Sequence, residues 1–194
     1  MSLVRSDAPR RRGAPVVEQV LDLALEELAR VGYHRLSVPE VAARAGLNKT
    51  SVYRRWPTKG ALVGAALAGA LGHDAPLPDT GALRSDLLAF VGAAAAWAET
   101  PVGRGVTRML FADVDDAEVR ALVTVIAATP GPMPIFTRAR ARGELPDDAD
   151  VALTMTVIAG ALLQRGLVER EPLTRAFLEQ LVDFALRELG VATS

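Results

Sequence analysis

The segment from Ser37 to Lys59, SVPEVAARAGLNKTSVYRRWPTK, constrains the fold of this 194-residue chain more than any other. Ser37 and Glu40 have the S-x-x-E spacing of a helix-capping box, and Pro39 falls in the first turn, where a missing N–H is tolerated. Gly46 is expected to end this helix, because glycine accepts the positive φ of a sharp reversal. The segment therefore predicts two short helices that meet at a tight turn.

The second helix is predicted to begin after Asn48, a favourable N-cap, and to run to about Trp56. Its outer faces carry side chains that are basic or can form hydrogen bonds, with no acidic residue among them: Lys49, Thr50, Ser51, Tyr53, Arg54 and Arg55. A helix-turn-helix presents such a helix to base edges and phosphates. DNA binding is the favoured interpretation, and an ordinary amphipathic hairpin with a solvated face is the alternative.

Charge is unevenly divided along the chain. Residues 1–60 contain eleven Lys and Arg against six Asp and Glu, a balance of +5, whereas the whole chain carries −1 and the remainder therefore −6. A basic module on an acidic body suits a polyanionic partner. Residues 1–14 include Arg10, Arg11 and Arg12 and predict a disordered arm, which either follows a DNA backbone or serves as a solubilising tail.

The composition argues against several other classes of protein. There is no cysteine, which excludes disulfides, thiolate metal sites and a cysteine nucleophile. His34 and His73 have no second ligand at helical spacing, and no catalytic constellation or phosphate-binding glycine loop is recognised, so we expect no metal, no cofactor and no enzyme activity. The apolar segments 61–72 and 87–98 are shorter than the roughly 20 residues of a membrane span, and no signal peptide is recognised, so a cytoplasmic location is expected.

Residues 15–71 resemble the DNA-binding domain of the TetR family of transcriptional regulators. The resemblance is carried by Gly32, Tyr33 and Ser37, by VAARAGLNKTSVY from Val41 and by RRWPTKGALV from Arg54. It implies that Lys49, Thr50 and Arg54 read bases, and that Ser37, Ser51, Tyr53, Arg55 and Lys59 contact phosphates. Lys59 is unfavourable in the first turn of a predicted helix 59–71 unless a phosphate lies there; otherwise its side chain points into water.

The periodicity predicts an all-α fold of about nine helices. We expect a basic arm (1–14), a three-helix DNA-binding domain with the helix-turn-helix (15–72), and a helical effector-binding and dimerisation domain (73–194) that begins with a linker, 73–80. The segment TPGPMPIF, 129–136, predicts a kink or loop because it contains three prolines. The phrase RGELP, 142–146, resembles the same point in TetR-family ligand domains.

The resemblance also implies a small-molecule site among the later helices. The candidate residues are large and apolar: Phe90, Trp97, Met109, Phe111, Met133, Phe136, Met155, Ile158 and Leu162. Ordinary core packing is the alternative for each of them. Because these stripes hold few charges, a small apolar effector is expected, with Thr107, Arg108 and Gln164 as polar contacts.

The last helix, predicted over 172–189, has an apolar arc too wide for one contact. One face can pack on its own subunit and the other on a partner, and small residues before it permit close approach. We expect a two-fold homodimer with a four-helix bundle. The predicted interface consists of Gly160, Phe177, Leu178, Leu181, Val182 and Phe184.

Together these features predict a sequence-specific transcriptional regulator. The favoured hypothesis is a repressor that binds a near-palindromic double-stranded operator and is released by its effector. The alternative is a helical ligand-binding or interaction protein whose basic face contacts an anionic partner other than DNA.

Overall fold

The computed structural model describes residues 14–70, 76–112, 116–127 and 131–191, and those residues form helices and no strands. The helices are α1 (Ala14–Val31), α2 (Val38–Arg44), α3 (Lys49–Arg55), α4 (Lys59–Ala70), α5 (Leu83–Ala98), α6 (Pro101–Ala112), α7 (Ala117–Ala127), α8 (Met133–Ala141), α9 (Val151–Leu163), the π-helical continuation η1 (Gln164–Glu169) and α10 (Arg175–Glu188). The predicted basic arm, apart from residue 14, and the start of the predicted linker, up to residue 75, lie outside the described residues.

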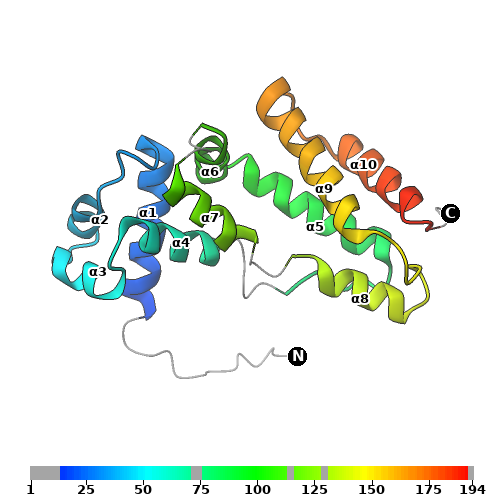
Figure 1. Ribbon diagram of the computed structural model, residues 1–194, viewed down its shortest axis with the longest axis horizontal. Helices are drawn as coiled ribbons and strands as arrows, with labels where there is room; N and C mark the ends of the chain where they lie inside the picture. The colour runs from blue at the N-terminus through cyan, green and yellow to red at the C-terminus, as the bar shows by residue number, and fades with distance from the viewer. Residues whose placement is uncertain (1–13, 71–75, 113–115, 128–130, 192–194) are drawn as a thin grey trace, which may run out of the picture.

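The first hydrophobic core is built by α1 to α4 and is completed by α6 and α7. Helix α1 packs against α2, α4 and α6, and α4 packs against α7. Val106 and Met109 from α6, and Val119 and Leu122 from α7, are buried with the side chains of the first four helices. Figure 1 shows α2 and α3 at one end of the molecule, with α6 and α7 beside α1 and α4 towards its middle. Two helices that follow the linker in sequence therefore belong to the core of the N-terminal part.

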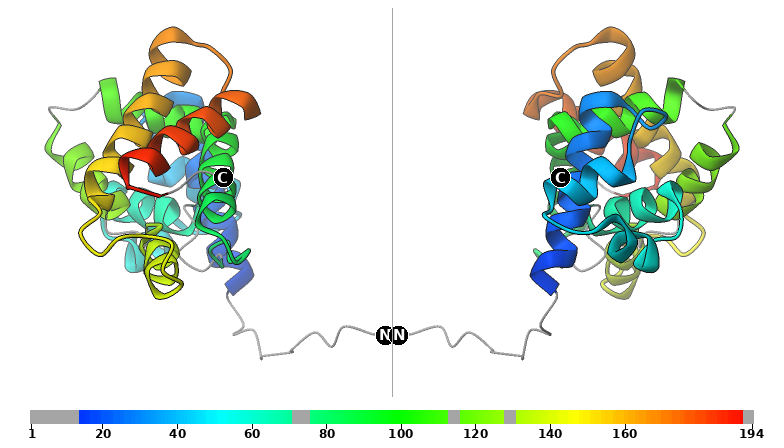
Figure 2. Two further views of the ribbon diagram at one scale, coloured as in Figure 1. Left: turned by 90° about the vertical axis from the view of Figure 1, so that its right-hand side faces the viewer. Right: turned by 90° about the vertical axis from the view of Figure 1, so that its left-hand side faces the viewer.

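The second core is formed by α5, α8, α9 and α10. Leu87 of α5, Ile135 and Phe136 of α8, and Val182 of α10 are completely buried in it. Helices α9 and α10 lie side by side at the end opposite α2 and α3, as the two views of Figure 2 show. Since α5 also packs against α6, it connects the second core to the first.

Helix α8 is an element that the sequence did not predict and that brings the number of α-helices to ten among the described residues. Pro132 stands at its N-cap and Pro134 lies in its first turn, where proline favours a helix start. Ile135 and Phe136 fill the second core, whereas Met133 is 51% exposed. The prolines thus start a helix at 133, within the segment that was expected to form only a kink or loop.

The RGELP phrase closes α8 and caps α5. Gly143 has a φ of +74°, the left-handed conformation of a helix end. The Glu144 carboxylate accepts the Leu83 N–H at 2.6 Å and pairs with Arg142, and Leu145 is buried in the second core. The Arg142 guanidinium, followed by the Leu83 amide, lowers the pKa of Glu144.

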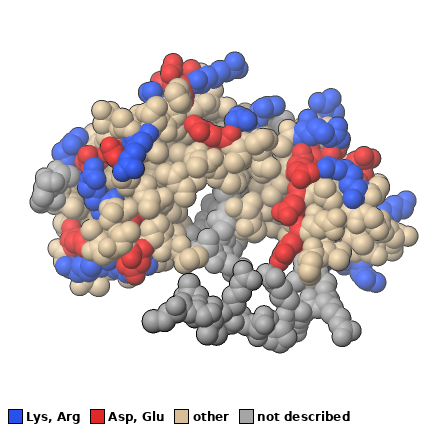
Figure 3. Space-filling view, turned by 180° about the vertical axis from the view of Figure 1, so that it is seen from behind, with Lys and Arg blue, Asp and Glu red and all other residues tan. Residues whose placement is uncertain are grey.

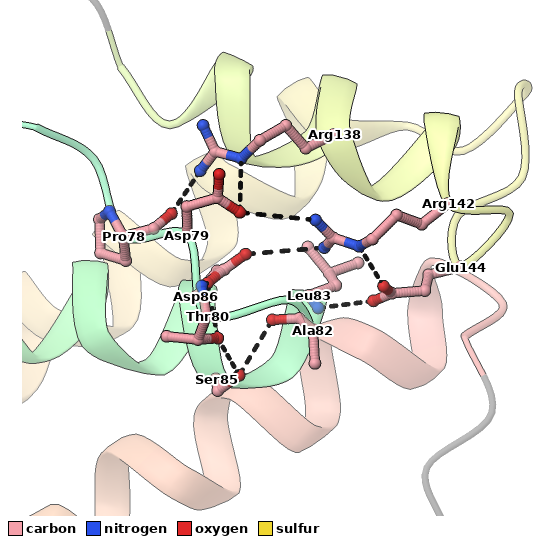
Figure 4. Close-up of polar contacts among 10 residues, drawn as sticks. All are labelled: Pro78, Asp79, Thr80, Ala82, Leu83, Ser85, Asp86, Arg138, Arg142 and Glu144. Carbon is pink, nitrogen blue, oxygen red and sulfur yellow. Dashed lines mark hydrogen bonds and ion pairs between the residues drawn. The ribbon is translucent and has the colours of Figure 1, made fainter.

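A polar network attaches the end of the linker to α5 and α8 (Figure 4). Asp86 is fully buried; its Oδ1 accepts the Thr80 N–H at 2.5 Å and the Thr80 hydroxyl at 2.7 Å, and its Oδ2 lies 3.6 Å from a guanidinium nitrogen of Arg142. Arg138 lies 3.4 Å from Asp79. A buried carboxylate needs such partners, so this network fixes where the chain leaves the linker.

The longest apolar helix is not one of the segments 61–72 and 87–98 that the sequence indicates as its longest apolar stretches. Residues Val151–Glu169 form a continuous helix of 19 residues with a mean hydropathy of 1.6, long and apolar enough to cross a membrane. Only 17% of it is buried within the chain. Its outer face therefore exposes apolar side chains that another surface could bury.

Candidate nucleic-acid interface

The turn between α2 and α3 is fixed by local hydrogen bonds. The Ser37 hydroxyl accepts the Glu40 N–H at 3.4 Å, and the Asn48 side-chain oxygen accepts the Thr50 N–H at 2.9 Å. Gly46 has a φ of +67°. These contacts confirm the predicted caps and turn, and they set α3 at the outer edge of the first core.

The outward face of α3 is polar and basic. Lys49, Thr50, Ser51, Arg54 and Arg55 are exposed, and Tyr53 is 40% exposed. On the inner side Val52 is fully buried, and the neighbouring Trp56 is largely buried. The Arg55 guanidinium lies 5.5 Å from the Trp56 ring centroid, and no described carboxylate forms an ion pair with a cation of α3. This helix therefore presents uncompensated positive charge.

Two arginines of α1 and α2 are paired with carboxylates. Arg44 lies 2.6 Å from Glu26 and 3.5 Å from the buried Glu27, and Arg30 lies 2.6 Å from Glu27. Figure 3 shows basic and acidic side chains next to each other at the end of the molecule that carries α1 to α3. The ion pairs leave α3, rather than α1 or α2, as the face suited to a polyanion.

Lys59 lies in a cluster between the first four helices and α7. Its Nζ is 4.3 Å from the Tyr33 ring centroid and 3.5 Å from the His34 carbonyl oxygen, so it does not simply point into water. The Tyr33 hydroxyl donates to Glu118 at 2.7 Å, and His34 Nδ1 lies 3.8 Å from Asp116. Burial, and then the contact with Glu118, raise the pKa of Tyr33. The cluster ties the helix-turn-helix to α7.

The nine candidate effector residues do not line one cavity. Trp97 and Met109 pack in the first core, and Phe90, Phe136, Met155, Ile158 and Leu162 pack in the second. Phe111 and Met133 are 52% and 51% exposed. Most of these nine side chains therefore pack inside one core or the other and do not line a shared cavity.

A cleft of about 790 Å³ lies between the ends of α5, α6, the α9–η1 helix and the segment that precedes α10. Among the predicted residues, Leu162, Thr107 and Arg108 line it. Arg104 and Arg170 also line it and were missed by sequence reasoning. No local signal marks them, because the cleft joins segments about 70 residues apart in the chain.

The six predicted interface residues divide between the interior and the surface. Val182 is fully buried, and Leu178 and Leu181 are nearly so, within the second core of the same chain. Gly160 is exposed, Phe184 is 43% exposed, and Phe177 is half-buried beneath the Arg165 guanidinium, 4.6 Å from its ring centroid. Beside Gly160, the outer face of α9 exposes Leu153 and Val157.

The fold and the basic α3 define a helix-turn-helix DNA-binding protein. The family model for bacterial regulatory proteins of the tetR family matches residues 20–66, and the model described as Tetracyclin repressor-like, C-terminal domain, matches residues 77–185. The chain belongs to the TetR family and is a DNA-binding transcriptional regulator.

Individual relatives span nearly the whole chain. It is 36% identical over 182 residues to the DNA-binding transcriptional repressor TetR of Mycobacteroides abscessus, covering 90% of this chain and 94% of that protein. It is 31% identical over 155 residues to the HTH-type transcriptional regulator AqdR of Rhodococcus erythropolis, covering 77% and 73%. The crystal structure of the TetR family transcription regulator SCO0332 superposes with a TM-score of 0.67 at 31% identity, covering 92% of this chain and 99% of that one.

Proposed function

We propose that this regulator is a cytoplasmic repressor that binds a near-palindromic operator as a homodimer. The single observation that carries the proposal is the exposed, unpaired basic face of α3. In this proposal Lys49, Thr50 and Arg54 contact base edges, because they project from an α-helix of a size that enters the major groove. Ser51, Tyr53 and Arg55 flank them and contact phosphates.

Two further residues at the edges of the helix-turn-helix are proposed to contact phosphates. Ser37 already caps α2 through its hydroxyl, which can still donate its proton to an anion. Lys59 is held over the Tyr33 ring by a cation–π contact, at the first turn of α4. A phosphate at that helix start would meet both the ammonium group and free backbone amides.

The proposed dimer is supported by the apolar outer face of α9 and its neighbour α10. Leu153 is 60% exposed, Val157 42% and Phe184 43%, and Gly160 leaves room for a second helix to approach. A contiguous exposed apolar surface of this kind marks an interaction site. The proposed contact is therefore centred on α9 and Phe184, with the buried part of the predicted set acting as its support.

The proposed effector site is the cleft beside α6. Helix α6 belongs to the first core, whereas α9 belongs to the second. A ligand that prefers one spacing of these walls shifts the position of the first core, including α3, relative to the dimer contact. Release of the operator follows when the two α3 helices no longer match successive half-sites.

Selection from a pool of random double-stranded DNA tests the proposal. We expect enrichment of a sequence with two-fold symmetry, and a log–log salt dependence of affinity steeper than about −5 for a dimer. Enrichment without symmetry would contradict the paired operator. Equal binding to all sequences, or to an acidic protein or anionic vesicles in preference to DNA, would contradict the function.

A further inference from the structure

The walls of the cleft come from different cores. Arg104, Thr107 and Arg108 of α6 form one side, and Leu162 and Leu163 of α9 face them. The volume of about 790 Å³ falls within the roughly 300–1,000 Å³ of small-molecule sites. A molecule bound here touches both cores.

The apolar part of the cleft is lined by short side chains from α5 and by leucines from the α9–η1 helix. These residues are Ala94, Ala95, Ala98, Leu162, Leu163 and Leu167. Small side chains from α5 and leucines from the α9–η1 helix together give the cleft an apolar surface. Such a surface suits an alkyl chain, whose burial is favourable in proportion to the apolar area it removes from water.

The charged part of the lining consists of three arginines and two glutamates. Arg104 donates to the backbone carbonyl of Glu99, and Glu171 also lines the cleft. Among the described residues, no carboxylate forms an ion pair with Arg108 or Arg170. The charged lining thus has a net positive charge and two guanidinium groups available to a ligand.

Arg170 is held in an unfavourable backbone conformation. It has φ 58° and ψ 31°, and it is the only non-glycine residue with positive φ among those the structure describes. It follows directly on the π-helical turn Gln164–Glu169, and π-helical turns are frequent at functional sites. Glycine would adopt this conformation without strain. Strain of this kind is typically retained where the side chain has a role.

We propose that the cleft binds an amphipathic anion, a molecule with an alkyl chain and one carboxylate or phosphate head, and that Arg108 and Arg170 hold the head. The proposal rests on the proposed effector site and specifies its chemistry. It revises the expectation of an uncharged effector, because that expectation considered only the apolar stripes of the sequence. Guanidinium groups bind carboxylates and phosphates through charge-assisted hydrogen bonds.

Four probes of equal chain length test the chemistry of the head. Binding of decanoate, decyl phosphate, 1-decanol and decylamine to the purified full chain is measured by calorimetry below their micelle-forming concentrations. We expect at least one of the two anions to bind roughly ten-fold more tightly than the alcohol and the amine, as one charge-assisted contact permits. The stronger of the two anions identifies the head as carboxylate or phosphate.

Single substitutions test the residues. Arg108→Gln and Arg170→Gly should each weaken anion binding by roughly ten-fold and leave the binding of 1-decanol unchanged. Arg187→Gln, on the exposed side of α10 and away from the cleft, is the matched control and should change neither. Arg170→Gly should also raise the melting temperature, because it removes the backbone strain.

Three results would overturn the proposal. Tighter binding of decylamine would assign the cleft to a cation held by Glu99 and Glu171. Equal binding of all four probes, or no binding, would show that the arginines do not select a head. Unchanged anion affinity in Arg170→Gly would make its conformation purely structural. Selection of an operator from random DNA does not depend on these outcomes, so each failure is distinguishable from a failure of the proposed function.

Discussion

The two hydrophobic cores differ in what they expose. The first core, with α1 to α4, α6 and α7, presents a basic polar helix, whereas the second, with α5 and α8 to α10, presents apolar side chains on α9 and α10. Because α6 and α7 pack with the first core, the division between the cores runs between α5 and α6 and not at the linker. The cleft lies on this division. A ligand in this cleft would therefore contact helices of both cores.

The largest expected effect is a loss of stability in the second core. Phe136→Ala leaves a cavity in the second core, where Phe136 is fully buried, and should lower the free energy of unfolding by about 3–5 kcal/mol. Phe111→Ala, at a side chain that is 52% exposed, is the matched control and should change it by less than about 0.5 kcal/mol. Urea unfolding measures both variants.

Hydrogen exchange in Phe136→Ala then tests which core α7 follows. Amides of α5 and α10 should exchange faster than in the unaltered chain. Amides of α7 should exchange as slowly as before, like those of α1 and α4. Equal acceleration in α7 and α10 would show that the two cores unfold as one unit, which would remove the basis of the comparison.

The next effect concerns the exposed face of the first core. Arg54→Ala should reduce discrimination between operator and mutated operator by about 1–3 kcal/mol, because a base contact is lost. Lys59→Ala should weaken binding to all sequences alike, since a phosphate contact carries no sequence information. Arg187→Ala, on α10, is the control. Competition binding at fixed salt measures the three variants, and an unchanged base preference in Arg54→Ala would refute its assignment.

A smaller effect tests the connection between the helix-turn-helix and α7. Tyr33→Phe keeps the buried ring but removes the hydroxyl that donates to Glu118, and it should destabilise the fold by about 1 kcal/mol. Tyr53→Phe, on the exposed face of α3, should leave stability nearly unchanged. Chemical unfolding compares the two. Equal stabilities would mean that the Tyr33–Glu118 hydrogen bond does not help to hold α7.

The smallest effect is the pH dependence contributed by Asp116. Its carboxylate accepts the N–H groups of Val119 and Glu118, which lower its pKa below the ordinary value, with a lesser contribution from His34. A lowered folded-state pKa means that this stabilisation is present above the unfolded pKa of about 3.9 and is lost as the pH falls through the folded pKa. The effect is small because the Asp116 side chain remains 30% exposed to water, which screens its interactions.

Asp116→Asn separates the charge from the cap. Asparagine caps a helix as well as aspartate does, so stability near neutral pH should change little. The melting temperature of the variant should fall less between about pH 6 and about pH 3 than that of the unaltered chain. A parallel fall in both proteins would assign the acid sensitivity to other carboxylates.

The helix-turn-helix was predictable because its signals are local. The Ser37 and Asn48 caps and the Gly46 turn act within four residues of their own positions, and the structure has each of them. Helix α8 is hard to predict because Pro132 and Pro134 can either break a helix or stand at its start, and here they stand at its start as Pro39 does in α2.

The cleft could not be predicted, for a different physical reason. Its lining is assembled by packing between α5, α6 and the α9–η1 helix, which no periodicity within one helix encodes. The left-handed Arg170 likewise carries no sequence mark, because the position is occupied by arginine and not by the glycine that usually adopts this conformation. Apolar periodicity made Phe136 and Ile158 candidates for a ligand pocket with core packing as the alternative, and the structure buries both in the second core.

One distance measurement tests most directly whether the α3 helices of the two proposed subunits are held at operator spacing and move when a ligand binds. The chain contains no cysteine, so Ala43→Cys on the exposed side of α2 gives a single site for a spin label. With operator bound, pulsed electron resonance should give one narrow inter-label distance, consistent with half-sites about 34–36 Å apart. That distance should change when a ligand fills the cleft. Absence of any inter-label signal would contradict the proposed dimer. A distance distribution that neither operator nor ligand alters would contradict the proposed movement of α3 with the first core.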